Sequence, residues 1–396
     1  MRKMISVCMT VFFVTITIIG CFPKPQDKYD KGYSSNNEPN GNEERDVSEF
    51  PIYIDDRDLE KLTFNAEVKM PTSFNINQKL SIASAEPRSW NRENIVSEIS
   101  NGRQVVNEFS GENSGPDDCY YSYIFDDNST LSFSLGFVYY YTEMEVKYNY
   151  NFYFDSYEFY KNDEIFDEMF STEDIEGIKK NDALDNASKV ISLLDIGDIL
   201  GEPKIYSMDA VSINRLQDEW DVRDKHGEKA IRWTNDQDAY LLLYPVCYQG
   251  IPSSNMNATG ENEIISSSSV YFVYGRKGMI TFNVSGIFDI KNTVQESLVY
   301  SPLDVVQNIK NYYENIILDT EIFVNRIKLV YVIRNDLETI TEWTVEPVWL
   351  VEGKYTDSAY GGKDGREGKD SIVERPYTIL ISAVSGKLFQ MLAIGG

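Results

Sequence analysis

The sequence predicts an α+β fold in which antiparallel sheets are each packed with a helix. Polar and apolar residues alternate over several segments, as in strands with one buried face. Two segments instead place apolar residues along one helical stripe. In the second half of the chain, a helix followed by strands and a hairpin occurs twice. We therefore expect two tandem helix-plus-sheet units, residues 184–290 and 301–396, preceded by a β-rich region at residues 48–165.

Residues 1–20 have the pattern of a bacterial lipoprotein signal peptide. Arg2 and Lys3 precede an uncharged apolar stretch that ends at Gly20, directly before Cys21. This stretch is short for a membrane span, and lipoprotein signal peptidase requires a small residue before the cysteine. The segment resembles lipoprotein signals in which the cysteine sulfur takes a diacylglycerol before cleavage. We expect lipidation at Cys21 and a lipid-anchored location on the extracytoplasmic face of the bacterial cell membrane, with an uncleaved anchor as the alternative.

Residues 21–47 carry the lipidated cysteine and a flexible tether. The segment consists mostly of Pro, Asn, Asp, Glu, Gly, Ser and Lys, with too few apolar residues to offset the entropy of ordering. Such a tether would hold a folded body clear of the lipid headgroups.

The β-rich region begins with two alternating segments, at 64–69 and around 80–83. Asn91 then opens a helix from Arg92 to Ser100, which Asn101-Gly102 ends. Between residues 119 and 160 the chain is dense in Tyr, Phe, Ser and Asn. Alternating apolar residues there predict antiparallel strands with one solvated face.

Each C-terminal unit opens with a helix. The first covers 184–194, and the second begins with Ser301 as its cap and Pro302 at its first position, running to about Ile317. Extended segments follow each helix. In the first unit they are expected at 204–213, 239–248, 269–274 and 279–285, and in the second at 326–334, 341–352, 377–382 and 388–392.

The two units look related by duplication. Tyr244-Pro245-Val246-Cys247-Tyr248 resembles Glu346-Pro347-Val348-Trp349-Leu350, and each is followed by a polar loop and a hairpin. Chance similarity is the alternative. Proline cannot donate a hydrogen bond to a neighbouring strand, so both prolines are expected at equivalent edges, strand starts or bulges.

The closing strands resemble a known group of proteins. Segments 327–331, 346–351 and 379–388 are similar to the last strands of the YycH/YycI group of extracytoplasmic regulators, and more loosely to PepSY-type modules. As a whole, the chain resembles uncharacterised lipoproteins of clostridial and related low-GC Gram-positive bacteria. Those regulators are held by a transmembrane helix and contact a sensor kinase, whereas this chain is expected to be lipidated, so partner identity does not carry over.

Charge and residue content exclude several activities. The 37 basic and 63 acidic residues give a net charge of −26, which repels nucleic acid. His226 is the chain's one histidine, so histidine-based triads and zinc sites lack their residues. Neither a Gly-x-Ser-x-Gly elbow nor a Ser-x-x-Lys motif is present, and the glycine-rich segment 361–370 lacks the spacing of a phosphate loop. We expect a non-enzymatic protein that uses no cofactor and no metal.

Two smaller questions stay open from the sequence. The turns Asp236-x-Asp238 and Asp126-Asp127-Asn128 offer oxygen ligands for calcium, but neither forms the twelve-residue calcium loop, so solvated surface turns are the preferred interpretation. Cys119 and Cys247 could form a disulfide or could be two small core residues.

Tyrosine is the one feature that suggests a ligand. Its ring has an apolar face and a polar tip, which suits peptides, sugars and protein surfaces, although packing within sheets also favours it. The possible ligand surface comprises Tyr139, Tyr141, Tyr148, Tyr150 and Tyr153.

The function expected from these features is that of a membrane-anchored protein-interaction or regulatory module of the cell envelope. Its partners would be the membrane, through the N-terminal lipid, and an envelope protein. A carbohydrate- or peptide-binding lipoprotein is the first alternative. A carboxylate-dependent cell-wall hydrolase is the second, because the spatial pairing of acids cannot be read from the sequence.

Overall fold

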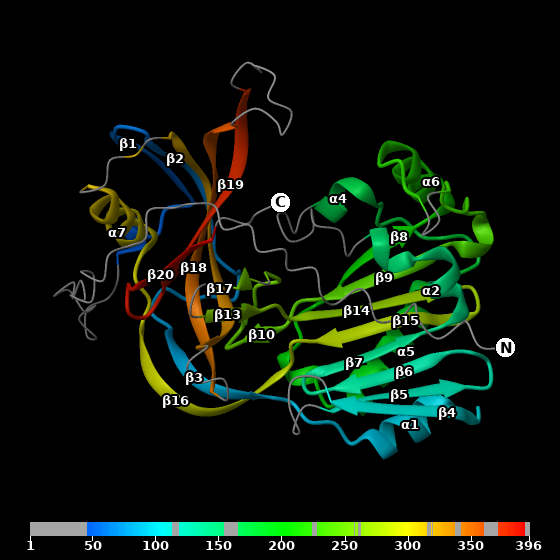
Figure 1. The fold of residues 1–396 in the computed structure, drawn as a ribbon. Helices are drawn as coiled ribbons and strands as arrows, with labels where there is room; N and C mark the ends of the chain where they lie inside the picture. Colours follow the sequence, from blue (N-terminus) through cyan, green and yellow to red (C-terminus); the bar gives the residue numbers. More distant parts are fainter. Residues whose placement is uncertain are drawn as a thin grey trace.

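The computed structural model describes residues 46–112, 119–153, 165–223, 228–256, 258–259, 263–314, 318, 320–336, 342–359 and 371–392. The fold is of the predicted α+β class, with few helices and mostly antiparallel sheets. Two large sheets lie side by side, as Figure 1 shows.

One sheet has eight strands, all antiparallel. In spatial order they are β4 (Val105–Glu112), β5 (Cys119–Phe125), β6 (Thr130–Ser134), β7 (Phe137–Tyr141), β15 (Gly278–Ser285), β14 (Ser269–Gly275), β9 (Ala239–Tyr244) and β8 (Lys204–Met208). The alternation of this sheet's residues between two buried clusters shows that both of its faces are packed around β14 and β9.

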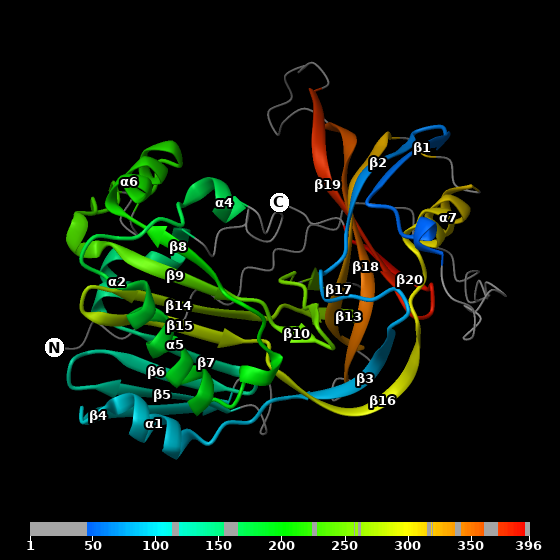
Figure 2. The same ribbon diagram turned by 180° about the vertical axis from the view of Figure 1, so that it is seen from behind.

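Helices cover both faces of this sheet. On one face lie α1 (Arg92–Ser100) and α5 (Lys180–Leu193), as Figure 2 shows from behind. On the other lie α2 (Glu143–Tyr148), α4 (Ile165–Met169) and α6 (Ala210–Glu219), which pack on a second cluster around Trp233. Short 3-10 helices are η1 (Val47–Glu49), η2 (Tyr150–Tyr153), η3 (Gly197–Ile199) and η4 (Asn235–Gln237).

The other sheet has ten strands and branches. Its strands are β1 (Tyr53–Leu59), β2 (Leu62–Lys69), β3 (Lys79–Pro87), β12 (Ala258–Thr259), β13 (Glu263–Ser266), β16 (Phe288–Leu298), β17 (Ile322–Asp336), β18 (Trp343–Ala359), β19 (Ser371–Ser382) and β20 (Leu388–Leu392). The central path is β1-β2-β17-β18-β19-β20, with β13 joining β17 and β3 joining β18. A small separate pair consists of β10 (Cys247–Tyr248) and β11 (Ile251–Pro252).

Helix α7 (Pro302–Tyr313) packs against the ten-stranded sheet. Its buried stripe includes Val305 and Ile309, and the Tyr313 hydroxyl lies 3.0 Å from that of Tyr377 on β19. Ser301 caps the helix and Pro302 begins it, as predicted, although the described helix ends at Tyr313 rather than near Ile317.

The strand pairing corrects the expected domain boundaries. The predicted N-terminal region 48–165 is divided between the sheets, because β1–β3 belong to the ten-stranded sheet and β4–β7 to the eight-stranded one. The eight-stranded sheet and its helices therefore form an inserted lobe within residues 88–286, from which β12 and β13 return to the ten-stranded sheet. The ten-stranded sheet and α7 form a flanking lobe, most of it from residues 46–87 and 287–392. β3 and β16 pair with each other where the chain leaves and returns, as Figure 1 shows. The largest buried cluster runs through both lobes, and each lobe has in addition a smaller cluster of its own.

A helix followed by an antiparallel four-stranded path does occur twice, as α5 with β8-β9-β14-β15 and as α7 with β17-β18-β19-β20. The two prolines, however, are not equivalent. Pro245 follows the end of β9, whereas Pro347 lies inside β18 between its pairing with β3 and its pairing with β19. Val246 belongs to the main core and Val348 to a cluster on the opposite sheet face. The expectation that these short segments correspond is therefore wrong.

The predictions for single helices and strands agree better with the structure than the predicted domain boundaries do. The helix over Arg92–Ser100 is confirmed, with Asn91 as its cap and Asn101 in the left-handed conformation at its end. The strands expected at 269–274 and 279–285 are confirmed as the hairpin β14–β15. The expected strand 204–213 is only partly correct, because it ends at Met208 and Asp209 then caps α6.

Candidate functional site

The strand β7 divides the predicted tyrosines between two faces. Tyr140 points into the main core, whereas Tyr139 and Tyr141 lie on the opposite face with Phe137. Ring centroids are 6.2 Å apart for Phe137 and Tyr139 and 5.2 Å apart for Tyr139 and Tyr141. The three rings therefore form one half-buried row along the strand.

Hydrogen bonds from the next turn fix the middle ring of this row. The Asn151 side chain donates from Nδ2 to the Tyr139 hydroxyl at 2.5 Å. The backbone N–H of Asn151 donates to Glu145 Oε1 at 3.2 Å. Burial, reinforced by the Glu145 carboxylate, raises the pKa of Tyr139 well above its usual value. Tyr139 is therefore a neutral phenol at physiological pH.

A polar row crosses the sheet next to Tyr139. The register places Phe109, Ser122, Ser132, Tyr139 and Asn283 opposite one another on five consecutive strands. The two serine hydroxyls lie 3.1 Å apart, and the Tyr120 hydroxyl lies 3.2 Å from Ser132 Oγ. We call the surface formed by Phe109, Tyr120, Phe137, Tyr139 and Tyr141 the aromatic face.

Two of the predicted ligand residues belong to the core instead. Tyr150 and Tyr153 are 0% and 1% exposed, and both rings pack on Trp233. The Tyr150 hydroxyl donates to the Gln237 carbonyl at 2.8 Å, and that of Tyr153 accepts from Gln217 Nε2. Their assignment to a ligand surface is wrong, because buried rings cannot meet a ligand. Tyr148 is half-buried at the border of the same cluster.

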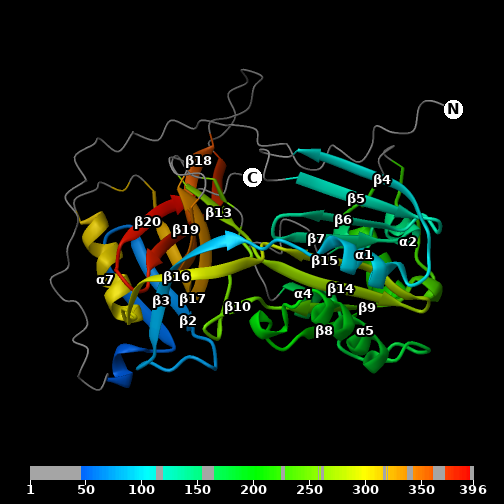
Figure 3. The same ribbon diagram turned by 90° about the horizontal axis from the view of Figure 1, so that it is seen from below.

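Strand β4 lies at the edge of the aromatic face and was not predicted. Val105, Val106 and Phe109 are 42%, 61% and 44% exposed. Phe109 is opposite Ser122 on the side of Tyr139, whereas Val105 is opposite the core residue Phe125 and Val106 lies at a bulge between them. Figure 3 shows β4 as the outermost strand of its sheet. The two valines and one phenylalanine favour a strand in the sequence, but without alternation this signal is weak.

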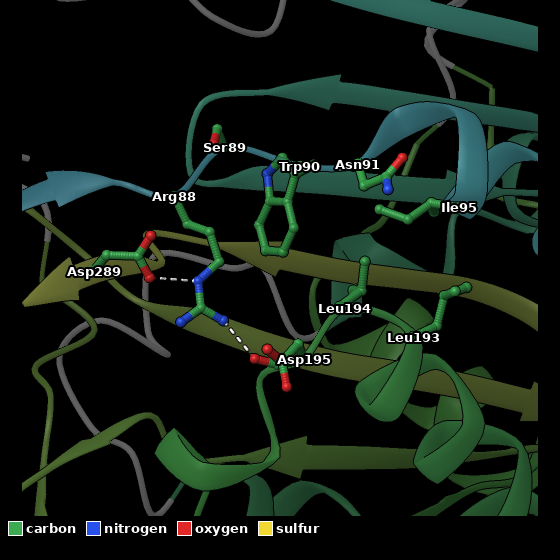
Figure 4. A pocket seen from close by; sticks show the side chains of 9 residues that line it. All are labelled: Arg88, Ser89, Trp90, Asn91, Ile95, Leu193, Leu194, Asp195 and Asp289. Carbon is green, nitrogen blue, oxygen red and sulfur yellow. Dashed lines mark hydrogen bonds and ion pairs between the residues drawn. The ribbon is translucent and has the colours of Figure 1, made fainter.

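A hollow of about 290 Å³ lies where the two lobes meet, shown in Figure 4. Arg88 crosses it and binds both sides, because its Nε atom lies 2.7 Å from Asp289 Oδ1 and its guanidinium donates to the Asp195 carbonyl at 2.6 Å. Trp90, Leu193 and neighbouring side chains complete the wall. The Arg88 guanidinium is thus already engaged in joining the lobes.

The acidic turns make internal contacts. Asp127 accepts from Ser129 and from Arg103, which lower the pKa of its carboxyl against the opposing effect of burial. Asp238 accepts from the Ala210 amide at 2.9 Å, and Arg276 lies 3.4 Å away. Across the ranges that the structure describes, no three His, Cys, Asp or Glu side chains gather in a metal-binding group.

Cys247 carries a free, half-buried thiol, so this residue forms no disulfide in the structure. Burial raises the pKa of this thiol.

Several predicted features lie outside the described residues. They include Cys21, the signal peptide, residues 22–45 of the tether and His226. Within the described part of the chain, no helix has the length and apolar character needed to cross a membrane.

Comparison with known proteins finds a similar fold but indicates no function. No protein-family model matches the chain, and no curated protein sequence matches it. A crystal structure of an uncharacterised protein from Eubacterium rectale is similar over 86% of this chain and 94% of its own, with 14% identity and a TM-score of 0.59. The coverage is too large for one lobe, so the similarity concerns the two-lobed fold as a whole.

Proposed function

We propose that the chain is a lipid-anchored, non-enzymatic interaction module of the bacterial cell envelope, which binds an envelope protein through the aromatic face. The observation that carries this proposal is the exposure of apolar β4 residues beside the aromatic face. Exposed apolar residues that gather in one place mark interaction surfaces, whereas single ones do not.

The chemistry of this face suits a protein partner. Aromatic rings bury large areas at low entropic cost, and their polar tips bind donors and acceptors. The hydroxyls of Ser132, which is 3% exposed, and of Tyr139 already bind other side chains of this lobe, so the polar groups beside the rings are satisfied within the protein. The lipid expected on Cys21 would keep the face near other envelope proteins.

The hydrolase alternative receives less support from the buried acids. Glycoside hydrolysis needs two carboxylates that flank one substrate bond. Glu346 and Asp238, both buried, each bind an arginine and a further donor inside the protein. These contacts engage both carboxylates inside the protein.

Carbohydrate binding is a second candidate, favoured by the row Phe137, Tyr139 and Tyr141. Rings tilted by 37° and 35° to one another form a nearly continuous apolar strip, on which sugar rings can stack. A thermal-shift screen with neutral oligosaccharides tests it. A stabilisation that Tyr141→Ala abolishes would favour this candidate over the protein partner.

Site-specific crosslinking tests the main proposal. A photoreactive phenylalanine analogue at Phe109 should crosslink the chain to an envelope protein in cells of a Gram-positive host. The same analogue at Val211, which is 81% exposed on α6, is the matched control. Equal crosslinking from both positions, or none from Phe109, would contradict the proposal.

The anchor is tested separately. Cys21→Ala should release the chain from the membrane fraction or leave the signal peptide uncleaved. Unchanged partitioning of this variant into detergent would contradict lipidation. The resemblance to the YycH/YycI group concerns β17–β20 only, and the proposal does not depend on it.

A further inference from the structure

The outer edge of β4 has unusual exposure. Every residue from Gln104 to Gly111 is exposed, although the strand is paired along its length with β5. Among the described strands β4 has no second neighbour, so one side of its backbone faces outward. An open strand edge is a template for pairing with another chain.

The hydrogen bonds show which backbone groups face outward. The Phe125 amide donates to the Ser129 carbonyl at 2.9 Å, so Phe125 and every second residue before it point toward β6. The residues between them point toward β4, and their register partners there are Asn107, Phe109 and Gly111. Glu108 and Ser110 therefore direct their backbone groups away from the sheet.

A side chain confirms this direction. The outward amide of Glu108 donates to Oδ1 of its own neighbour Asn107 at 3.0 Å. The Glu108 carbonyl and both backbone groups of Ser110 remain for a further strand.

Three other edge strands, β1, β16 and β8, carry lysine or arginine, whereas β4 carries two glutamates and β20 carries no charged residue. β1 has four charged residues in a row, Asp55, Asp56, Arg57 and Asp58. β16 carries Lys291 and Glu296, and β8 begins with Lys204. Charges, and lysine above all, discourage edge pairing. β4 contains neither lysine nor arginine, and its exposed valines and phenylalanine favour contact.

The surroundings of β4 are acidic. The described residues 91–112 and 119–128, which supply α1, β4 and β5, contain six acidic and two basic residues. Both arginines are engaged, because Arg92 lies 3.4 Å above the Tyr121 ring and Arg103 binds Asp127. A second copy would bring acid to acid, whereas a cationic strand would be attracted.

We propose that β4 receives an extended, lysine- or arginine-bearing segment of a partner protein, which adds to the eight-stranded sheet as a ninth strand. Backbone hydrogen bonds to Glu108 and Ser110 supply the register, and the acidic surroundings select the charge. This inference rests on the proposed function and specifies the partner's chemistry.

Amide hydrogen exchange on the chain from residue 22 onward tests it. The probe is a short synthetic peptide that alternates lysine with valine, and the control peptide has glutamate in place of lysine. The lysine peptide should slow exchange of the Ser110 amide by at least about tenfold, while the Phe109 amide is already protected by β5. The glutamate peptide should leave both unchanged.

A matched pair of variants isolates the edge. Ser110→Pro removes one outward donor and should weaken binding of the lysine peptide about fivefold, because one hydrogen bond is lost. Ser110→Ala keeps that donor and should bind as the parent does. Asn107→Ala frees the Glu108 amide and should bind more tightly. Circular dichroism of each variant shows that the sheet is intact.

Several results would overturn the inference. They are equal protection by the glutamate peptide, an unchanged Ser110 amide, protection of that amide before any peptide is added, and a dimer that Ser110→Pro dissolves. The last two would assign the edge to another segment of the chain or to a second copy. Crosslinking from Phe109 in cells without peptide binding would refute the cationic strand and leave the proposed function standing. Peptide binding without crosslinking from Phe109 would support the cationic strand and contradict the proposed function.

Discussion

The Nε atom of Arg334 lies 3.0 Å from Oε2 of Glu346, whose side chain is 2% exposed. This ion pair joins β17 to β18, the two longest strands. The other carboxylate oxygen accepts from Ser382 Oγ at 2.6 Å, which adds β19. One buried carboxylate thus binds three neighbouring strands of the ten-stranded sheet.

Removing the arginine should therefore be costly. Arg334→Met leaves a buried carboxylate without its cation and should lower the free energy of unfolding by about 3–5 kcal/mol. Glu346→Gln keeps an acceptor for Ser382 and should cost less. Urea unfolding of the single and double variants checks this, and a double variant no more stable than Arg334→Met would contradict it.

Asp238 should give a stability change that depends on pH. Burial raises the pKa of its carboxyl, although the Ala210 amide and Arg276 oppose this. Between its usual and its raised pKa the folded chain holds more protons than the unfolded one, so stability falls as pH rises through that window. Asp238→Asn keeps an oxygen for Ala210 and should raise the melting temperature at pH 7. The gain should vanish below about pH 3, and an equal loss at both pH values would refute it.

Ser301 should contribute measurably through its cap on α7. Its hydroxyl accepts from the Asp304 amide at 3.2 Å and donates to the Asp304 carboxylate at 2.8 Å. Ser301→Ala should cost about 1 kcal/mol of unfolding free energy. Leu303→Ala, at a 43% exposed position of the same helix, is the control and should cost less. Equal losses in thermal unfolding would argue against the cap.

Gly353 should tolerate no side chain. A Cβ there would lie 2.1 Å from the Phe323 carbonyl oxygen on β17, beside a bulge in the pairing. Gly353→Ala must separate two central strands and should lower the free energy of unfolding by more than about 3 kcal/mol. Gly111→Ala, where a Cβ meets nothing within 4 Å, should be neutral. Similar melting temperatures for both would be inconsistent with this packing.

Sequence patterns predicted those elements that depend on residues close together in the chain. The helix over Arg92–Ser100 follows from its cap and its stop, both set within a few residues. The parallel pairing of Leu62 with Ile322 depends on residues far apart in the chain, and neither strand's pattern indicates its partner.

The candidate site was predicted only in part for a related reason. Tyr139 and Tyr141 follow the alternation of a strand, which gave their shared face. Tyr150 and Tyr153 lie in a 3-10 helix, where the three-residue period turns both inward. The sequence gives little signal for β4, because a strand that is exposed on both faces needs no alternation of polar and apolar residues.

The pairing of Leu62 with Ile322 also constrains how the protein assembles. During synthesis β2 appears early, whereas the strand that completes its side of the sheet is made near the end. In the interval β1 and β2 can form only a two-stranded hairpin, which is marginally stable by itself. The inserted lobe can form much of its sheet sooner, because β4 to β15 are complete before β17 is translated. Truncated chains that stop before Ile322 should consequently expose an unfinished flanking lobe to chaperones and proteases.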